Sequence, residues 1–474
     1  MTRKIVIEPV TRLEGHGKVT IHLDDDGNVA QARFHATQLR GFEKFCEGRL
    51  FWEMPVITPR ICGICPVSHH LAAAKAGDSL LGVELTPTAK LLRQLLHMAQ
   101  YLQSHSLHFF HLASPDLLLG MDADPAIRNV VGLIGQKPEL AVKGVRLRAF
   151  GQKIIETLGG KRVHPNAAIP GGMNKALPAE AREDILKQID GMIADVQIAI
   201  DLIKGYYEQH GKECAHFANF PSGYLGLVDD NGNLELYDGK LRLKDDKGAI
   251  LEDKIAPEDY LSIIEERVED WSYLKFPYYK KMGYPAGIYR VGPLARLNVA
   301  DGITTPLASK EFKNFKKMSK NGIVEGSLYY HYARLIEALY AAERIKALAQ
   351  DDLICGKDIW VNSNKLNEEA VGVVEAPRGT LIHHYWIDKS GAIRKANLIV
   401  ATGHNNLAMN RAVYEVAREF IKKGEVTEGI LNRVEVAIRC YDPCLSCAAH
   451  ALGHMPLEID IYDSAGNLYW RLRS

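Results

Sequence analysis

Apolar residues recur at helical spacing along several long stretches of the chain. Between residues 89 and 112, leucine and methionine return every three or four positions, and similar spacing covers residues 138–158, 181–208 and 328–350. A further helix is expected over residues 406–421. The pattern therefore predicts a helical bundle as the largest part of the fold.

Alternating or β-branched stretches between turn signals predict small sheets elsewhere. Residues 4–37 contain such stretches around the turn sequence DDDGN, which indicates a small antiparallel sheet. Residues 217–256 place short strands between Asn-Gly, Asp-Gly and Lys-Gly turns, which is typical of a meander inserted at the surface. Hairpins are expected at residues 380–402 and in the last segment, LEIDIYDSAGNLYWRL.

The predicted fold class is α+β and mainly helical. It has a central helical bundle with small antiparallel sheets at the N-terminus, in a middle insertion and near the C-terminus. We divide the chain into five parts, which are the N-terminal sheet and lead-in (1–59), a first cysteine motif with the helical bundle (60–216), a β-rich insertion (217–310), a part with helices, hairpin and second cysteine motif (311–450), and a C-terminal extension (451–474).

Length and charge narrow the class of protein. Single hydrophobic cores stop growing at roughly 250–300 residues, and this chain has 474. A chain of this length is large enough to bury a cofactor completely. The 58 basic and 58 acidic residues cancel, which removes the electrostatic argument for nucleic acid or an anionic membrane surface. The start lacks signal-peptide features, and no window approaches about 18–20 uninterrupted apolar residues. We therefore expect a cytoplasmic protein whose partners are proteins or small molecules.

Four of the eight cysteines form two C-x-x-C pairs at opposite ends of the chain, Cys62 with Cys65 and Cys444 with Cys447. Four thiolates can surround a soft transition metal. A structural zinc site is one interpretation, although zinc ribbons usually join pairs only about 15–20 residues apart. We expect the remaining cysteines to be packed thiols, namely Cys46, Cys214, Cys355 and Cys440.

Polar residues flank both pairs. Arg60 precedes the first pair and His69 follows it, while Asp442 precedes the second pair and His450 follows it. Charged and hydrogen-bonding neighbours orient the ligands of a catalytic metal and tune its chemistry, and a structural zinc would not need them.

The motifs R-x-C-G-x-C-x-x-x-H and D-P-C-x-x-C-x-x-H formed by these residues resemble the signature pair of the nickel-iron hydrogenase large subunit. The resemblance spans most of the chain and is least diagnostic at residues 217–310. It extends through RLEGH at 12–16, RGFE at 40–43, HFFHLASPD at 108–116 and EAPRG at 375–379.

This resemblance implies a buried nickel held by Cys62, Cys65, Cys444 and Cys447. Cys65 and Cys447 would also bridge to an iron that carries carbon monoxide and cyanide ligands. Cys444 would be the terminal thiolate that first receives the proton from dihydrogen, and Glu14 would carry that proton onward. Taken alone, Glu14 could equally be an exposed acid at a strand end.

The resemblance also assigns roles around the metals. Arg378 would place its guanidinium over them, with Asp116 and Asp442 as acidic partners that a buried arginine needs. Asp442 has a competing role as the first residue of an Asp-Pro turn. His69 would hydrogen-bond a bridging thiolate, whereas His70 has no motif support and is expected to be structural.

Further matches concern a second metal ion and the iron ligands. Glu43 and His450 match family ligands of a magnesium or related ion. Thr402 is placed to hydrogen-bond an iron ligand, but Ala401 stands where many relatives have proline, so the local backbone is expected to differ.

The implied reaction is the reversible heterolytic cleavage of dihydrogen. No further cysteine cluster could hold iron–sulfur centres and no G-x-G-x-x-G follows a strand, so a separate electron-transfer subunit is implied. The length and the ending DPCLSCAAHALG resemble the large subunit of the cytoplasmic bidirectional, NAD-reducing hydrogenases. In these complexes a small iron–sulfur subunit passes electrons to a diaphorase module that contains FMN and reduces NAD. Deazaflavin-reducing or NADP-linked relatives remain alternatives, as do a complex I-like redox scaffold and a four-cysteine zinc protein.

Residues 451–474 extend past the point where mature family members end. They resemble the extension that a dedicated endopeptidase removes after chaperones have inserted nickel, which predicts cleavage after His450. The alternative is a permanent final hairpin.

Overall fold

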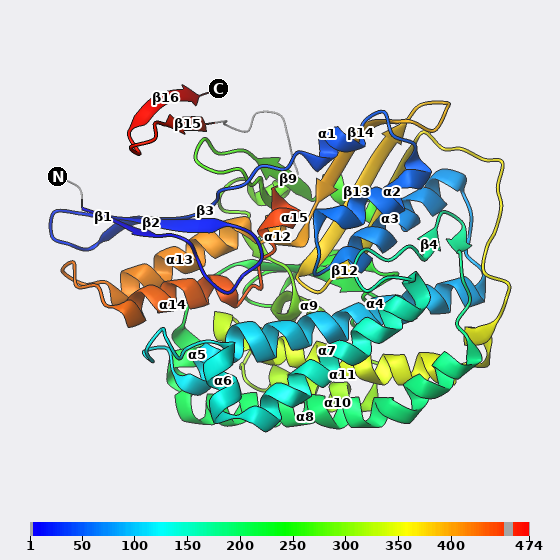
Figure 1. Ribbon diagram of the computed structural model, residues 1–474, viewed down its shortest axis with the longest axis horizontal. Coiled ribbons are helices and arrows are strands. Elements are labelled where there is room, and N and C mark those ends of the chain that lie inside the picture. Colours follow the sequence, from blue (N-terminus) through cyan, green and yellow to red (C-terminus); the bar gives the residue numbers. More distant parts are fainter. Residues whose placement is uncertain (1–2, 450–457, 474) are drawn as a thin grey trace.

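The computed structural model describes residues 3–449 and 458–473 (Figure 1). Its N-terminal sheet is antiparallel in the order β1-β2-β3, with β1 at Lys4–Ile7, β2 at Gly17–Leu23 and β3 at Val29–Ala36. Alternate residues such as Val19, Ile21 and Phe34 are buried, and β3 packs against α13 (Asn406–Phe420). The predicted N-terminal sheet is confirmed.

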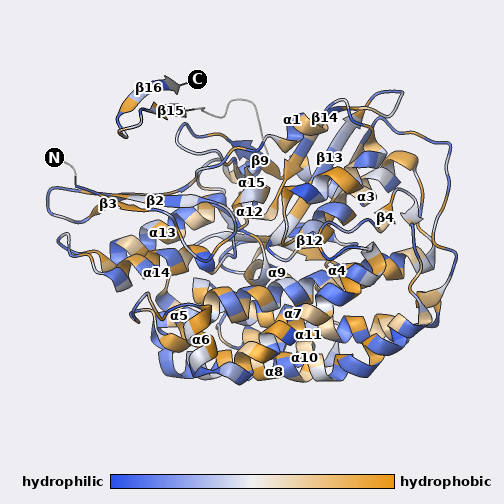
Figure 2. Cartoon of the chain, viewed as in Figure 1, coloured by the Kyte–Doolittle hydropathy of each residue, from blue (hydrophilic) through white to orange (hydrophobic). Residues whose placement is uncertain are grey.

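Four long helices form the bundle that the spacing predicts. They are α4 (Pro87–Leu107), α7 (Pro138–Gly159), α8 (Ala179–His216) and α11 (Tyr330–Gln350). Helix α4 packs against α7 and α11, and α11 packs against α8. Figure 2 shows apolar and polar residues interleaved along α7 and α8, as expected for helices with one face on the core. Helix α11 is buried on nearly every side, because it runs through the middle of the bundle.

A second antiparallel sheet lies above the bundle and carries part of the site. Its strands are β12 (Glu369–Ala376), β13 (Gly379–Ile387) and β14 (Ile393–Ile399), in that order. The predicted hairpin over residues 380–402 is confirmed as β13 and β14. Helix α3 (Pro66–Leu81), which follows the first cysteine pair, packs on β12 and β13 (Figure 1).

The middle insertion contains the predicted meander, β6 (Gly223–Val228), β7 (Lys240–Lys244) and β8 (Ile250–Ile255), and β11 (Tyr289–Arg290) adds parallel to β6. The prediction that this meander lies at the surface is wrong. Strand β6 is buried because α9 (Pro293–Val299) covers it on one side and β12 and β13 contact it on another. The insertion therefore belongs to the core that supports the second sheet.

The other elements connect these layers, and the C-terminal segment forms the predicted hairpin. The residues 450–457, including His450, lie outside the described ranges. Within the described ranges, no helix combines the length and apolar character needed to cross a membrane. The remaining bounds are α1 (Phe42–Cys46), α2 (Met54–Ile57), α5 (Ser114–Leu119), α6 (Val130–Gln136), α10 (Pro306–Lys316), α12 (Ala401–His404), α14 (Glu428–Arg439), α15 (Leu445–Ala448), β4 (Ala168–Ile169), β5 (Gly172–Met173), β9 (Ile264–Arg267), β10 (Phe276–Tyr279), β15 (Glu458–Tyr462) and β16 (Leu468–Arg473).

Candidate metal centre

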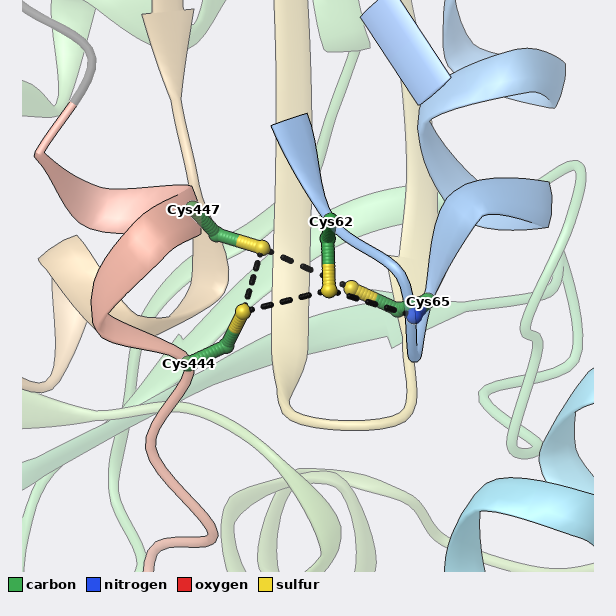
Figure 3. A group of neighbouring side chains, drawn as sticks. All are labelled: Cys62, Cys65, Cys444 and Cys447. Carbon is green, nitrogen blue, oxygen red and sulfur yellow. Dashed lines mark hydrogen bonds between the residues drawn. The ribbon is translucent and has the colours of Figure 1, made fainter. Parts of the chain in front are cut away.

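The two cysteine pairs meet in the interior of the protein. Cys65 directly precedes α3, and Cys444 directly precedes α15, so each pair is placed at the start of a helix. Sulfur–sulfur distances are 3.3 Å from Cys62 to Cys444 and 3.5 Å from Cys65 to Cys447. All four sulfurs lie within 4.8 Å of one another, and Figure 3 shows them pointing toward a common centre. The predicted convergence of the four cysteines is therefore present.

Burial makes this cluster costly without bound cations. All four side chains are nearly inaccessible to solvent. Burial raises the pKa of Cys444 and Cys447, whereas hydrogen bonds with the other cysteines lower the pKa of Cys62. The amides of Ile64 and Cys65 also donate to the Cys62 sulfur, at 3.2 and 3.3 Å. Four thiolates can coexist here only if positive charge balances them, which is the condition that soft metal ions satisfy.

The N-terminal RLEGH motif packs directly on the second cysteine pair. The amide of Leu445 donates to the Glu14 carbonyl at 3.0 Å, and Glu14 and Cys444 form a parallel backbone bridge. Gly15 has φ +88°, and a Cβ at this position would come within 2.7 Å of the Leu445 Cβ. Only glycine fits this close approach without strain. The motif thus fixes one end of the chain against the other.

The carboxylate of Glu14 contacts the cluster itself. Its Oε2 accepts from the Cys444 thiol at 3.0 Å and from the Ser446 amide at 3.1 Å. Cys444 is fully buried, while Glu14 is partly exposed. The side chain of Glu14 therefore spans from the buried sulfur toward solvent, the position that its predicted role in proton transfer requires.

Arg378 lies in the two-residue turn between β12 and β13. It donates from Nε to the Asp442 carbonyl at 2.5 Å and from Nη2 to Asp442 Oδ1 at 3.0 Å. Burial alone lowers the pKa of Arg378, but Asp442 and the neighbouring cysteines outweigh burial and raise it well above the usual value. Arg378 is therefore a permanent positive charge beside the four sulfurs, and Asp442 is the acidic partner that the sequence predicts.

Asp116 does not have the partner expected for it. Its carboxylate pairs with Arg12 at 2.5 Å and with Arg439 at 2.9 Å, rather than with Arg378. Asp116 lies at the start of α5, after a π-helical turn (His108–Ala113) that ends α4. The predicted pairing of Asp116 with Arg378 is wrong in this structure, because two closer arginines take both carboxylate oxygens. Arg12 belongs to the RLEGH motif, which is the sequence signal that could have indicated it.

The two adjacent histidines have different surroundings. His69 lies 3.1 Å from His383, measured between Nδ1 and Nε2, and lines the small cavity beside Cys65. His70 donates from Nδ1 to the Pro55 carbonyl and accepts at Nε2 from the amides of Ala167 and Ala168. Both nitrogens of His70 are therefore used in holding backbone, which agrees with its expected structural role. No sequence signal pointed to His383.

Thr402 and Glu43 contact the backbone near the site. The Thr402 hydroxyl oxygen accepts from the amide of Cys444 at 2.9 Å, a contact that the sequence did not indicate. Glu43 is buried at α1, and its Oε1 accepts from the amide of Leu398 at 2.8 Å. His450, the other candidate ligand of a second metal, lies outside the described residues.

A small cavity adjoins the sulfurs on the side of Arg378 and Thr402. Its volume is about 10 Å³, enough for one water-sized group, and Cys65, Cys444 and Cys447 form part of its wall. Among the described residues, Arg378 Nη1 and Asp442 Oδ2 are buried without a hydrogen-bond partner. Four soft donors, a bordering space and a spare charged donor suit a metal centre that binds further small ligands. A closed structural zinc site needs neither the space nor the donor.

These features define a transition-metal enzyme, and comparison with known proteins identifies the family. The sequence profile described as "Nickel-dependent hydrogenase" matches residues 40–127 and 230–450, and a profile described as "HoxL-like" matches residues 4–39. The chain belongs to the nickel-dependent hydrogenase family, and it is a hydrogenase catalytic subunit. Its four-cysteine cluster is a metal-binding site that fits a nickel-dependent enzyme.

Similar proteins span nearly the whole chain. It is 47% identical to the NAD-reducing hydrogenase HoxS subunit beta of Cupriavidus necator, covering 99% of both chains. It is 43% identical to one of the subunits of the F420-non-reducing hydrogenase of Methanothermobacter thermautotrophicus, covering 99% of this chain and 100% of that one. A crystal structure of an NAD⁺-reducing [NiFe]-hydrogenase in the H2-reduced state superposes with a TM-score of 0.92 at 49% identity, over 95% of this chain and 100% of that one. The mainly helical fold with small antiparallel sheets is thereby confirmed.

Proposed function

We propose that the chain cleaves dihydrogen heterolytically and reversibly, and that Cys444 and Glu14 carry the proton out of the site. The 3.0 Å contact between the Cys444 thiol and the Glu14 carboxylate, at the edge of the four-cysteine cluster, is the observation that supports this proposal. Cys62, Cys65, Cys444 and Cys447 would hold nickel, and Cys65 and Cys447 would also hold iron. When bound, such a centre supplies a redox-active Lewis acid at which dihydrogen is polarised.

The surrounding side chains provide a base, a relay and fixed donors. Cys444 accepts the proton at its sulfur and passes it to Glu14 Oε2, from which it reaches the exposed side of that residue. Arg378 remains charged, and its unpaired, buried Nη1 would be available to donate to carbon monoxide or cyanide ligands of a bound iron. Thr402 accepts from the Cys444 amide, so its hydroxyl proton is free to donate to the same ligands. His69 would orient a bridging thiolate.

Electrons would leave through an iron–sulfur small subunit to a diaphorase module with FMN, and finally to NAD. This route is supported by the 47% and 49% identities to proteins that are themselves named as NAD-reducing. The alternative acceptors are a deazaflavin or NADP. The relative at 43% identity over 99% of the chain is named F420-non-reducing, a name that gives the deazaflavin no support. A cytoplasmic location belongs to the same proposal, because NAD turnover takes place there.

The experiment is hydrogen-driven reduction by the purified complex with NAD, NADP or a deazaflavin as acceptor, and with an artificial dye as reference. Reduction of dye and NAD supports the whole proposal. Dye reduction without NAD reduction contradicts the electron route but keeps the hydrogenase reaction. Inactivity with every acceptor, in protein that contains nickel and iron, contradicts the proposed chemistry.

A second, harder metal ion would bind Glu43 and His450. Glu43 has a buried carboxylate, the donor type that magnesium prefers, and its Oε1 is fixed by the Leu398 amide. Equilibration with magnesium and manganese, followed by metal analysis of wild type and Glu43→Gln, tests this assignment. Equal magnesium and manganese content in both proteins would contradict it.

Cleavage after His450 by a maturation endopeptidase, following nickel insertion by chaperones, completes the proposal. The family profile ends at residue 450, and the solved relative aligns in full over only 95% of this chain. Intact-mass analysis of active protein tests the claim. A mass that includes residues 451–474 in active enzyme would refute it.

A further inference from the structure

A buried ionic cluster supports the backbone of the turn that carries Arg378, whereas Asp442 binds the Arg378 side chain. Its centre is Arg296 on α9, with Glu337 on α11, Glu375 at the end of β12 and His105 on α4. All four side chains have zero exposure. Burying four polar or charged side chains costs much desolvation energy. This cluster contacts the backbone just before Arg378, so it bears on the position of that residue.

Arg296 uses every N–H of its guanidinium. Nε and Nη2 donate to the two oxygens of Glu337 at 2.6 and 2.7 Å, and Nη1 donates to Glu375 at 2.7 Å. The two remaining N–H groups donate to the carbonyls of Ala376 at 2.9 Å and Pro377 at 3.0 Å. Those carbonyls immediately precede Arg378. Arginine has five donors in a fixed fork, and all five are used here.

Two further contacts hold the same turn. The Tyr101 hydroxyl lies 2.8 Å from the Glu375 carbonyl and 3.1 Å from that of Ala376, so α4 also supports the strand end. Gly292, which precedes α9, has φ +94°, and a Cβ there would meet the Arg378 carbonyl at 2.7 Å. The backbone of α9 therefore lies against Arg378 itself, and Arg296 couples the turn to two bundle helices through Glu337.

We propose that Arg296 is a positioning residue for the hydrogenase reaction, because it fixes the backbone carbonyls before Arg378 and so sets where the Arg378 guanidinium lies. This inference rests on the proposed function of Arg378 as a donor to the iron ligands. Asp442 fixes two donors of the Arg378 side chain but none of the turn's backbone carbonyls. Without Arg296 the turn would lose two buried hydrogen bonds to its backbone and be free to shift. A displacement of about 1 Å can cost roughly 10²-fold in rate.

The test compares Arg296→Lys with a matched control, Arg93→Lys. Arg93 is equally buried, forms a two-bond pair with Asp78 at 2.6 and 3.1 Å, and donates to the carbonyls of Ile169 and Gly172. Asp78 lies near the far end of α3 from Cys65. Both variants keep a positive charge and lose the guanidinium fork, so they should lose similar thermal stability.

The expected results differ at the metal centre. Arg296→Lys should shift the infrared stretching bands of the iron ligands and lower kcat by about 10²-fold, while nickel content stays at the wild-type level. A crystal structure should show the Arg378–Asp442 side-chain contact, 3.0 Å in the wild type, displaced. Arg93→Lys should leave the bands, kcat and this contact unchanged. Unchanged bands and an unmoved Arg378 in Arg296→Lys, or equal shifts in both variants, would overturn the proposal.

Tyr101→Phe keeps the proposal testable if Arg296→Lys does not assemble. This variant removes only the hydroxyl that contacts the same turn, so a smaller shift of the same bands is expected, and bands identical to wild type would overturn the proposal. Wild-type protein that contains nickel but lacks these bands would contradict the proposed function instead, which separates the two failures.

Discussion

Replacing Glu14 by glutamine tests the proton relay with little change in shape. The glutamine oxygen can still accept from the Ser446 amide, 3.1 Å from Oε2 in the wild type, but the amide group cannot take a proton from the Cys444 sulfur at 3.0 Å. Cys444 is fully buried, so bulk water cannot replace the carboxylate directly. Loss of a positioned proton acceptor typically slows a reaction by about 10²–10⁴-fold, which corresponds to a barrier increase of about 3–5 kcal/mol.

The assay is the enzyme-catalysed exchange of isotope between dihydrogen and deuterated water. Nickel and iron content are measured on the same samples. Glu14→Gln should lose exchange by that factor with metal content unchanged. Glu14→Asp keeps a carboxylate on a shorter side chain and should recover part of the rate. Glu8→Gln, a change of the same kind at an exposed position in the same segment, should have no effect. Exchange at the wild-type rate in Glu14→Gln would refute the relay.

Three further predictions concern the centre and its surroundings. Cys65→Ser should prevent assembly, so nickel and iron should both be lost in metal analysis, and normal loading would contradict the ligand assignment. Asp442→Asn leaves the Arg378 charge buried without its acidic partner, which should cost about 3–5 kcal/mol in denaturant unfolding; a loss below about 1 kcal/mol would show that the pair matters little. Burial lowers the pKa of His70 and of His105 to about 4, below the unfolded value of about 6.5. Between these pH values the unfolded chain therefore binds more protons than the folded one, so the denaturant midpoint of unfolding should fall as pH drops from about 6.5 to 4. His70→Gln should weaken this pH dependence. A midpoint that does not change with pH would contradict the prediction.

The helices and the convergence of the cysteines could be predicted because each depends on local signals. Spacing of three and four residues defined α4, α7, α8 and α11, and the two C-x-x-C motifs need only their own residues to indicate a shared metal. Glu14 beside Cys444 followed from the family resemblance of RLEGH and not from local signals, since the residue alone could equally be an exposed acid at a strand end.

Pairings between distant polar residues could not be predicted in the same way. Asp116 meets Arg12 and Arg439 rather than Arg378, and the choice among three arginines depends on how α4, α5 and α14 pack. The contact from the Cys444 amide to Thr402 depends on the path of the backbone at residues 401–404, where Ala401 replaces the expected proline. The burial of β6 could not be predicted for the same reason. Short strands between turns have the same sequence pattern whether other elements pack on them or they face solvent.

The cluster behind Arg378 depends on the same long-range packing. Arg296, Glu337 and His105 come from three helices far apart in the sequence, and none lies in a motif that indicated function. Their common position becomes visible only once α4, α9 and α11 are packed together.

Metal analysis combined with infrared spectroscopy of the purified protein tests the central claim most directly. Nickel and iron in equal amounts, with bands of carbon monoxide and cyanide, are the expected result for a centre held by Cys62, Cys65, Cys444 and Cys447. Stoichiometric zinc without nickel, and no such bands, would contradict it.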